Sequence, residues 1–448
     1  MDPKRISVRL LVLLFLCGII SSCSNDDNNT PIPIVEENLE EPPIEKPEEE
    51  NSEEEPAIVE GELGSVTFFH KDLIQDHVIL VNDAMDNRVY LMDTNANLVH
   101  EWPLGDRKIG NDAFLLPDGT LLASLQATNP EILFGGFGGK IQLIGKNGET
   151  LWNFDYSDSL KRTHHDVEML PNGNILAIAW EKMPLQLAVE NGSNRNVDIY
   201  PESVLEINPH TNVIVWEWHS WDHLVQDFDD TKLNYGVVSQ NPQLINLNYV
   251  EAPDGNIMHA NGIAYDEDND LIYLSVNFYS EVWVLDHSTT TEVAATHAGG
   301  NFGKGGDLIY RFGNPSAYND NISVRKFYNN HFPNLFEPGK MLLFSNGGNL
   351  EQSSIFELQL PVELSEQQIP LNTFPTVLWS FTDENLYSPK VSGAVRLSNG
   401  NTLITEGDYG IWEVTPNSEV VWKFGAEGFF WRAYSYAKDS AAILALDL

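Results

Sequence analysis

Cysteine is almost absent from this chain of 448 residues. Its two cysteines, Cys17 and Cys23, both stand near the N-terminus. The rest of the sequence therefore has no disulfide, no thiol nucleophile and no thiolate ligand for a metal. A region of about 390 residues must then be held together by an apolar core, to which the eleven tryptophans can contribute.

Basic residues are also scarce. The chain has 25 Lys and Arg against 66 Asp and Glu, which gives a formal net charge of −41. Even without its acidic N-terminal part, the region 61–448 carries about −30. Such a surface is repelled by nucleic acids and by anionic bilayers, so neither is an expected partner.

Long apolar runs are missing except between Leu10 and Ile20, and this run is too short to span a bilayer comfortably. It follows three basic residues and precedes Ser21, Ser22 and Cys23, which is typical of an export signal. The small residues ending in cysteine resemble the lipobox of bacterial lipoproteins. We therefore expect a signal peptide over 1–22 and lipidation of Cys23, the alternative being an ordinary signal-peptidase site.

The segment that follows is rich in acidic residues and proline. Residues 24–60 hold fourteen Asp or Glu and one Lys, too little apolar surface to form a core. We expect 23–60 to be an extended tether and 61–448 to be one folded domain. The motif SNDDNN after Cys23 resembles the acidic export tag of surface lipoproteins. The predicted location is the outer membrane, through the lipid anchor only, facing the periplasm or the cell surface.

Extended helical periodicity is absent as well, and two β-type phrases recur instead. One is a tight Asp-Gly or Asn-Gly turn followed by an apolar strand, and the other is a strand, a turn and a strand ending in tryptophan. Together they mark six units, near 78–102, 112–152, 165–218, 259–312, 331–381 and 393–424. This repeat predicts an all-β fold, a six-bladed β-propeller of four-stranded antiparallel blades. The tryptophans are expected to pack between blades.

Three histidines occupy equivalent places in three of these units. His165, His259 and His331 each stand 10 to 12 residues before a short apolar run. Equivalent positions of neighbouring blades converge on the central channel, so the three imidazoles should meet there. Asn111 and Ser392 fall at the matching position of two other units, which indicates a polar channel.

Gathered imidazoles allow two kinds of chemistry. They could bind zinc or copper, although the His-x-His and His-x-x-x-His spacings are missing among them. Alternatively, one imidazole attacks a tetrahedral oxyanion while the others and nearby amides stabilise the developing charge. No cofactor is implied by the second reading.

A set of ordered phrases makes the interpretation more specific. THHDVEMLPNGNILAIAWE, MHANGIAYDEDNDLIYLS, EVWVLDHSTTTE, GKGGDLIYRFGNPSAY, NNHFPN with LLFSNGG, and SGAVRLSNGNTLITEG together resemble bacterial arylsulfotransferases of the 3'-phosphoadenylyl-sulfate-independent type. The resemblance runs from about residue 75 to 436.

The resemblance implies transfer of a sulfuryl group from an aryl sulfate to a phenol, by a ping-pong scheme through a sulfohistidine. His331 matches the nucleophile, and His165 and His259 match the sulfate-binding histidines. The further residues expected to bind substrate are His164, Asn261, Asn277, Asn346 and Tyr279. Cationic imidazoles beside His331 are expected to lower its pKa and to neutralise the sulfuryl oxygens. No metal and no cofactor are expected.

One position departs from the family pattern. Where the family commonly has an arginine as a sulfate ligand, this chain has Asn277, and His164, Arg311, Arg325 or Arg432 would have to supply the charge. Two alternatives therefore remain open. One is a metal-dependent hydrolase or lyase that uses the same histidines, and the other is a non-catalytic surface propeller that binds aromatic or sulfated ligands.

Overall fold

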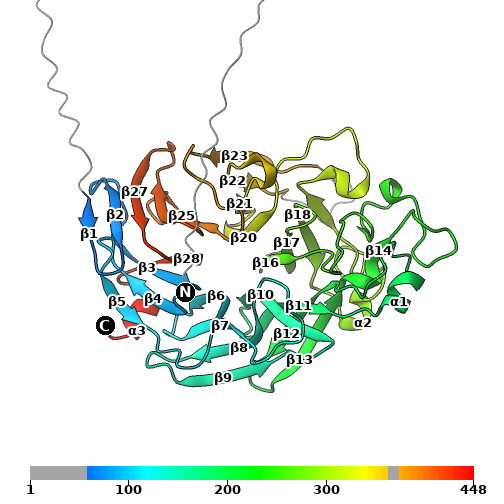
Figure 1. Ribbon diagram of the computed structural model, residues 1–448, viewed down its shortest axis with the longest axis horizontal. Coiled ribbons are helices and arrows are strands. Elements are labelled where there is room, and N and C mark those ends of the chain that lie inside the picture. Colours follow the sequence, from blue (N-terminus) through cyan, green and yellow to red (C-terminus); the bar gives the residue numbers. More distant parts are fainter. Residues whose placement is uncertain (1–57, 362–372) are drawn as a thin grey trace, which may run out of the picture. The chain divides into compact units, whose positions relative to one another are not determined.

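The computed structural model describes residues 58–361 and 373–448. The predicted signal peptide, Cys23 and most of the predicted tether lie outside these residues. Six antiparallel sheets surround one axis, with strands β6, β10, β16, β20 and β28 nearest the centre (Figure 1). This arrangement confirms the predicted six-bladed β-propeller.

The blades follow one another along the chain, and each runs from its innermost to its outermost strand. Blade 1 consists of β28 (Phe430–Ala437), β3 (His77–Asp83), β4 (Arg88–Met92) and β5 (Leu98–Glu101). Blade 2 consists of β6 (Ile109–Leu115), β7 (Leu121–Gln126), β8 (Gly139–Ile144) and β9 (Thr150–Asp155). Blade 3 consists of β10 (Lys161–Met169), β11 (Ile175–Glu181), β12 (Glu202–Asn208) and β13 (Val213–His219).

The remaining blades repeat the same order. Blade 4 consists of β16 (Ala260–Asp266), β17 (Leu271–Val276), β18 (Glu281–Asp286) and β19 (Tyr310–Phe312). Blade 5 consists of β20 (Asn330–Glu337), β21 (Lys340–Ser345), β22 (Ser354–Gln359) and β23 (Thr376–Phe381). Blade 6 consists of β24 (Gly393–Arg396), β25 (Thr402–Glu406), β26 (Gly410–Val414) and β27 (Val420–Gly425).

Short elements occupy the connections between these strands. The α-helices are α1 (Leu185–Glu190), α2 (Thr291–Ala294) and α3 (Ala441–Ala445). The 3-10 turns are η1 (Ser220–His223), η2 (Val238–Gln240), η3 (Pro315–Tyr318) and η4 (Gly348–Leu350). A parallel pair, β14 (Leu224–Val225) with β15 (Ile245–Asn246), lies in the long connection between blades 3 and 4. Within the described residues, no helix has the length and apolar character needed to cross a membrane.

Local sequence explains the shape of each blade. The turn at Asn172-Gly173 joins β10 to β11, with Gly173 at φ 82°, a value that glycine adopts without strain. The second strand of a blade is covered on both faces by neighbouring blades, and every residue of β11 is buried. Of the strand-ending tryptophans, Trp102, Trp216 and Trp422 are buried as expected, whereas Trp152 is half-buried.

Three strands depart from the sequence prediction. β28, from the C-terminal end of the chain, becomes the innermost strand of blade 1 and pairs with β3, which closes the ring. At the other end, β1 (Val59–Glu60) and β2 (Ser65–Phe69) add to the outer edge of blade 6 and make it six-stranded. Residues 59 and 60, assigned to the tether, therefore belong to the sheet.

Candidate active site

Five of the six innermost strands share an irregularity near their first residues. In β10 the pairing register shifts between His164 and Val167, and comparable shifts occur in β6, β16, β20 and β28. His165 and His259 adopt the left-handed backbone conformation, with φ of 52° and 55°. A bulge changes the direction in which side chains point. The left-handed conformation is unfavourable for a histidine unless the surrounding structure fixes it. The repeated bulge turns polar side chains of separate blades toward the same place.

His331 lies in β20 and is almost completely buried. Its Nδ1 is 2.6 Å from Oδ1 of Asn346 and 3.3 Å from the carbonyl oxygen of Asn329. The orientation of the Asn346 amide is fixed, because its Nδ2 donates to the carbonyls of Ser388 and Val391 at 2.8 and 3.0 Å. Both partners of Nδ1 only accept, so Nδ1 carries the proton and Nε2 keeps its lone pair.

The pKa of His331 favours the same neutral form. Burial, together with the nearby charge of Arg432, lowers this pKa to about 4, although the hydrogen bond from Nδ1 to Asn346 opposes the shift. At neutral pH the imidazole is therefore uncharged and its Nε2 is available for attack.

His165 lies at the end of a buried chain of hydrogen bonds. Oε2 of Glu202 is 2.7 Å from Nε2 of His164, and Nδ1 of His164 is 2.8 Å from Nδ1 of His165. The other carboxyl oxygen, Oε1, accepts from the indole of Trp180 and from the amide of Ala260. Sequence alternation places His164 and His165 on opposite faces of the strand, but the bulge brings their rings together.

The protonation states of these residues set the direction of the hydrogen bonds from Glu202 to His165. Burial raises the pKa of Glu202 well above its usual value and lowers the pKa values of His164 and His165 well below theirs. A protonated Glu202 donates to Nε2 of His164, whose Nδ1 then donates to Nδ1 of His165. Under this arrangement, His165 carries its own proton on Nε2.

His259 contacts His165 directly. Their ring centroids are 4.8 Å apart at an interplanar angle of 81°, and the Phe278 ring stacks on His259 with its centroid 4.7 Å away. Nδ2 of Asn256 lies 2.7 Å from Nδ1 of His259. With this amide donating, His259 carries its proton on Nε2. Burial, followed by the charge of His331, lowers the pKa of His259 to about 3.

The three Nε2 atoms of His165, His259 and His331 have no partner within the residues that the structure describes. One offers a lone pair and two offer N–H groups. The expectation of cationic imidazoles is wrong for this state, because burial keeps all three rings neutral. Neutral imidazoles supply hydrogen bonds but no charge.

The charge comes from Arg432, which sequence analysis named only as a substitute. Arg432 lies in β28, and its guanidinium bonds to Asp166 at 2.6 Å and to the carbonyl of Asn261 at 3.1 Å. Its Nη1 is 3.5 Å from Asp112, and its Cζ lies 4.1 Å from the centre of the Phe332 ring. Burial opposes its charge, but Asp166 and Asp112 outweigh burial and raise its pKa.

The asparagines predicted to bind substrate lie around this centre and hold the backbone. Nδ2 of Asn261 donates to the carbonyl of Asn330 at 2.8 Å, while its Oδ1 is buried without a partner among the described residues. Asn277 accepts from Nδ2 of Asn329 at 3.0 Å, which leaves its amide engaged with protein. Asn346 positions His331, as described above.

Tyr279 does not lie with the channel histidines. It is fully buried, its hydroxyl donates to the carbonyl of Asn246 at 2.6 Å, and it packs against Trp283 in the core. The predicted substrate contact of Tyr279 is therefore corrected to a structural role. Arg311 is also structural, since it is fully buried and paired with Glu281.

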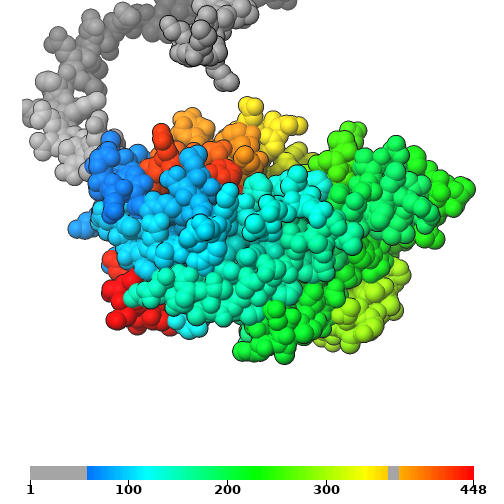
Figure 2. Space-filling view, turned by 60° about the horizontal axis from the view of Figure 1, so that its bottom comes forward, coloured from blue at the N-terminus to red at the C-terminus, as the bar shows by residue number. Residues whose placement is uncertain are grey.

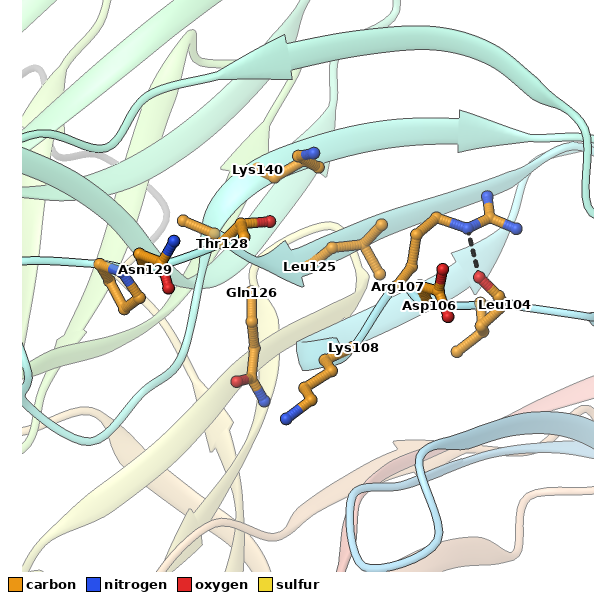
Figure 3. A pocket seen from close by; sticks show the side chains of 11 residues that line it. Leu104, Asp106, Arg107, Lys108, Leu125, Gln126, Thr128, Asn129 and Lys140 are labelled. Carbon is orange, nitrogen blue, oxygen red and sulfur yellow. Dashed lines mark hydrogen bonds between the residues drawn. The ribbon is translucent and has the colours of Figure 1, made fainter.

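The loop 127–138 of blade 2 reaches the histidines. A Cβ placed on Gly136 would lie 1.9 Å from Cε1 of His165, so only glycine fits at this contact. The first residues of the same loop line a hollow of about 580 Å³, together with Arg107, Lys108 and Lys140 (Figure 3). None of the channel histidines lines this hollow.

Comparison with known families favours one of the readings of this site. The family model described as Arylsulfotransferase (ASST) matches residues 67–298, just over half of the chain. The chain belongs to the arylsulfotransferase family. Membership supports arylsulfotransferase activity in general. The matched range includes His164, His165, His259 and Asn277 and ends before β20, which carries His331.

Three solved structures resemble this chain only remotely. The β-propeller domain of Myceliophteria thermophila Cps50 (Swd1) is 11% identical, with 82% of this chain and 95% of that chain covered and a TM-score of 0.42. BamB of Moraxella catarrhalis is 8% identical, with 87% of this chain and 95% of that chain covered and a TM-score of 0.35. Kuenenia stuttgartiensis hydrazine synthase is 15% identical, with 62% of this chain and 67% of that chain covered and a TM-score of 0.36. Similarities this low support no conclusion about the function of this chain. No match is found among curated proteins.

Two positioning residues of the site, Glu202 and Asn256, escaped the sequence analysis, which named Arg432 only as a substitute for the family arginine. Glu202 and Asn256 stand just outside the repeated phrases, and Arg432 lies on the closing strand that the repeat did not reveal. A signal existed only for Arg432, whose place in β28 corresponds to the bulge of the other innermost strands.

Proposed function

We propose that the protein transfers a sulfuryl group from an aryl sulfate to an acceptor phenol, through a covalent sulfohistidine at Nε2 of His331 and without a nucleotide donor. The observation that carries this proposal is the tautomer of His331. Asn346 and the Asn329 carbonyl hold the proton on Nδ1, which leaves a lone pair on Nε2 in an uncharged ring.

Each half-reaction balances with the residues present. In the first, Nε2 of His331 attacks sulfur, an N–S bond forms, and the sulfur–oxygen bond to the aryl group breaks with its electron pair leaving on the phenolate. In the second, the oxygen of the acceptor phenol attacks sulfur and the N–S electron pair returns to Nε2. The departing phenolate gains a proton and the acceptor phenol loses one, so no net proton is consumed.

The other groups stabilise the sulfuryl oxygens. The Nε2–H groups of His165 and His259 donate to them, and Arg432 supplies a permanent positive charge nearby. Sulfuryl transfer, like phosphoryl transfer, passes through a loose transition state in which positioning and charge stabilisation account for most of the catalysis. Phe278, stacked on His259, offers an aromatic face beside this position.

Two features weigh against a nucleotide donor and against a metal-dependent hydrolase. The glycine-rich segment 299–306, which lacks the spacing of a phosphate loop, contacts blade 3 and α2 and not the channel histidines. In the described part of the chain, the groups whose donor atoms gather as a metal site do not include His165, His259 or His331. A metal-dependent hydrolase would need that gathering.

The decisive experiment follows release of 4-nitrophenol from 4-nitrophenyl sulfate by the purified protein. The assay is run with and without phenol as acceptor, and with and without EDTA. We expect release that depends on phenol and persists in EDTA, and a protein of increased mass, by one sulfuryl group, when the acceptor is omitted. Binding of the aryl sulfate without any release would identify a non-catalytic propeller, and loss of release with EDTA would favour the metal-dependent reading.

His331→Ala tests the nucleophile. We expect turnover to fall by at least about 10³-fold and the mass increase to disappear, while the unfolding midpoint changes little. The assay measures nitrophenol release, and the control measures thermal unfolding of the same sample. A large loss of stability with residual sulfuryl transfer would show instead that His331 has a structural role.

We also propose that the protein is exported and anchored in the outer membrane by a lipid on Cys23. The basic, apolar and small-residue order of residues 4–23 supports this proposal. Cys23→Ala, expressed in a bacterium that processes lipoproteins, should abolish incorporation of labelled palmitate and release the protein from the membrane fraction. Unchanged labelling would overturn the proposed anchor.

A further inference from the structure

A second cluster of histidines lies outside the channel, between blades 3 and 4. His223 closes η1 just after the outer strand β13, and His297 and Asp307 belong to the insertion 287–309 that joins β18 to β19. The insertion packs along β13 through α2, at the outer rim of the ring (Figure 1). In the space-filling view of Figure 2, lime-green atoms, whose colour marks residues near 300, adjoin green atoms of residues near 210.

The donor atoms of this cluster converge on one carboxylate oxygen. Oδ1 of Asp307 is 2.8 Å from Nδ1 of His223 and 2.7 Å from Nδ1 of His297. One donor atom from each residue lies within 4.8 Å of the other two. His223 is fully buried and the side chain of Asp307 is 6% exposed, whereas the His297 side chain is 62% exposed. The cluster is thus buried on one side and open to solvent on the other.

The hydrogen bonds of His223 define its chemistry. Nε2 lies 2.8 Å from the carbonyl oxygen of Ala294, which only accepts, so Nε2 must carry a proton. In a neutral imidazole, Nδ1 then has a lone pair that faces the Asp307 carboxylate. Two electron-rich atoms at 2.8 Å repel each other unless a proton lies between them or a cation binds both from one side.

The surroundings of His223 match those of a metal ligand. A metal-bound histidine commonly donates its second ring N–H to a carbonyl, which fixes the orientation of the ring. Gly306 permits this contact, because a Cβ at that position would lie 2.0 Å from the Ala294 oxygen and 2.5 Å from Nε2 of His223. Two imidazoles, one carboxylate and an open position are a ligand set typical of zinc.

A neighbouring cluster shows how the same residue types satisfy one another without a metal. His219 lies between Glu181 and Glu217, at 2.7 and 3.5 Å. Burial opposes the charge of His219, but its hydrogen bonds to the two carboxylates raise its pKa to about 9. In that cluster each ring nitrogen of an imidazolium faces its own carboxylate, so both contacts are hydrogen bonds. At Asp307 two ring nitrogens face one carboxylate oxygen, and Nδ1 of a neutral His223 has no proton to donate.

We propose that His223, His297 and Asp307 bind a zinc ion, which fastens the insertion 287–309 to the end of β13. The site is independent of sulfuryl transfer, because its residues belong to the outer rim and contact none of the channel histidines. Its effect is on stability: a metal that binds only the folded chain stabilises it in proportion to the logarithm of the metal concentration.

The test uses the full chain purified without a histidine tag, stripped with EDTA, dialysed and titrated with ZnCl₂ while thermal unfolding is recorded. At a zinc concentration about a hundredfold above the dissociation constant, we expect the midpoint to rise by about 3–6 °C. MgCl₂ should give no rise, because this ion prefers oxygen ligands. Elemental analysis of the unstripped protein should find about one zinc per chain.

His297→Ala separates a zinc site from an ion pair. The side chain is exposed, so the metal-free midpoint should stay within about 1 °C of wild type while the zinc-dependent rise is lost. His210→Ala, at an exposed histidine outside the cluster, should keep the full rise. The proposal is overturned if zinc has no effect on the wild type, or if His297→Ala retains the rise, which would place the binding elsewhere.

Discussion

Asn346 is the residue on which the tautomer of His331 depends. Asn346→Ala removes the acceptor for Nδ1–H, so the ring can place its proton on Nε2 and lose the attacking lone pair. We expect the first half-reaction to slow by roughly 10²-fold with a smaller change in KM, because the group orients the nucleophile and does not hold the substrate. Single-turnover release of nitrophenol measures the effect.

Asn346→Asp is the matched variant. It keeps an acceptor for Nδ1 but adds a negative charge, which raises the pKa of His331 from its value of about 4. In the wild type, the single-turnover rate should stay level from pH 8 to about pH 5, since His331 protonates only below that range. In the variant, the fall in rate should begin at higher pH. An identical pH profile would contradict the assigned role.

Glu202 acts through its protonated form if the direction of the hydrogen-bond chain is as inferred. Glutamine imitates a protonated carboxyl, because it donates from one atom and accepts at the other. We therefore expect Glu202→Gln to keep kcat and KM within about threefold of wild type, whereas Glu202→Ala leaves His164 and the indole of Trp180 unpaired and lowers stability by about 1–3 kcal/mol. A drop above about tenfold in Glu202→Gln would instead indicate an ionised carboxylate.

At the scale of elements, the loop 127–138 offers a paired test of how the scaffold positions His165. Gly136→Ala adds a methyl group where the imidazole lies and does so at φ 83°, so the loop or the ring must move. Gly135→Ala adds the same group where nothing lies within 4 Å. We expect a loss of about 10-fold or more in kcat/KM for Gly136→Ala and almost none for Gly135→Ala.

Steady-state kinetics with 4-nitrophenyl sulfate measures both glycine variants, and circular dichroism checks that each is folded. Equal activities in the two variants would mean that the contact between Gly136 and His165 does not constrain the catalytic geometry.

Strand patterns predicted the blades well because each blade repeats a local signal. Alternation and Asn-Gly turns depend on neighbouring residues, so the register of His165, His259 and His331 could be read from the chain. The bulge could not be read, because it results from packing at the channel. For that reason His164 was expected on the opposite face, and Tyr279 was placed beside substrate although it packs in the core.

At the scale of the whole molecule, the closure of the ring could not be predicted from local sequence patterns. β28 pairs with β3 across about 350 residues of chain, and no repeated phrase identifies a strand that completes a blade begun at the other terminus. Arg432 belongs to this strand and touches residues of four other innermost strands, β6, β10, β16 and β20. The closing strand therefore also supplies the charge at the centre of the ring.

Arg432→Met tests this central role. The substitution keeps an extended side chain but leaves the buried carboxylates of Asp112 and Asp166 without their cation. We expect a loss of about 3–5 kcal/mol in the free energy of unfolding, together with the loss of activity. Adding Asp112→Asn removes one of the uncompensated charges and should restore part of the stability but not the activity. Denaturant unfolding of the two variants and the wild type measures these differences.

The pH dependence of that loss provides a further check. Burial and the neighbouring Asp166 already raise the pKa of Asp112 to about 7 in the wild type, against the opposing charge of Arg432. Without the arginine this pKa rises further. A carboxyl whose folded pKa is raised stabilises the fold while it is protonated, and this stability is lost as the pH rises through the folded pKa. The difference between variant and wild type should thus be larger at pH 8 than at pH 5, and a difference that shrinks toward pH 8 would show that Arg432 does not compensate these two carboxylates.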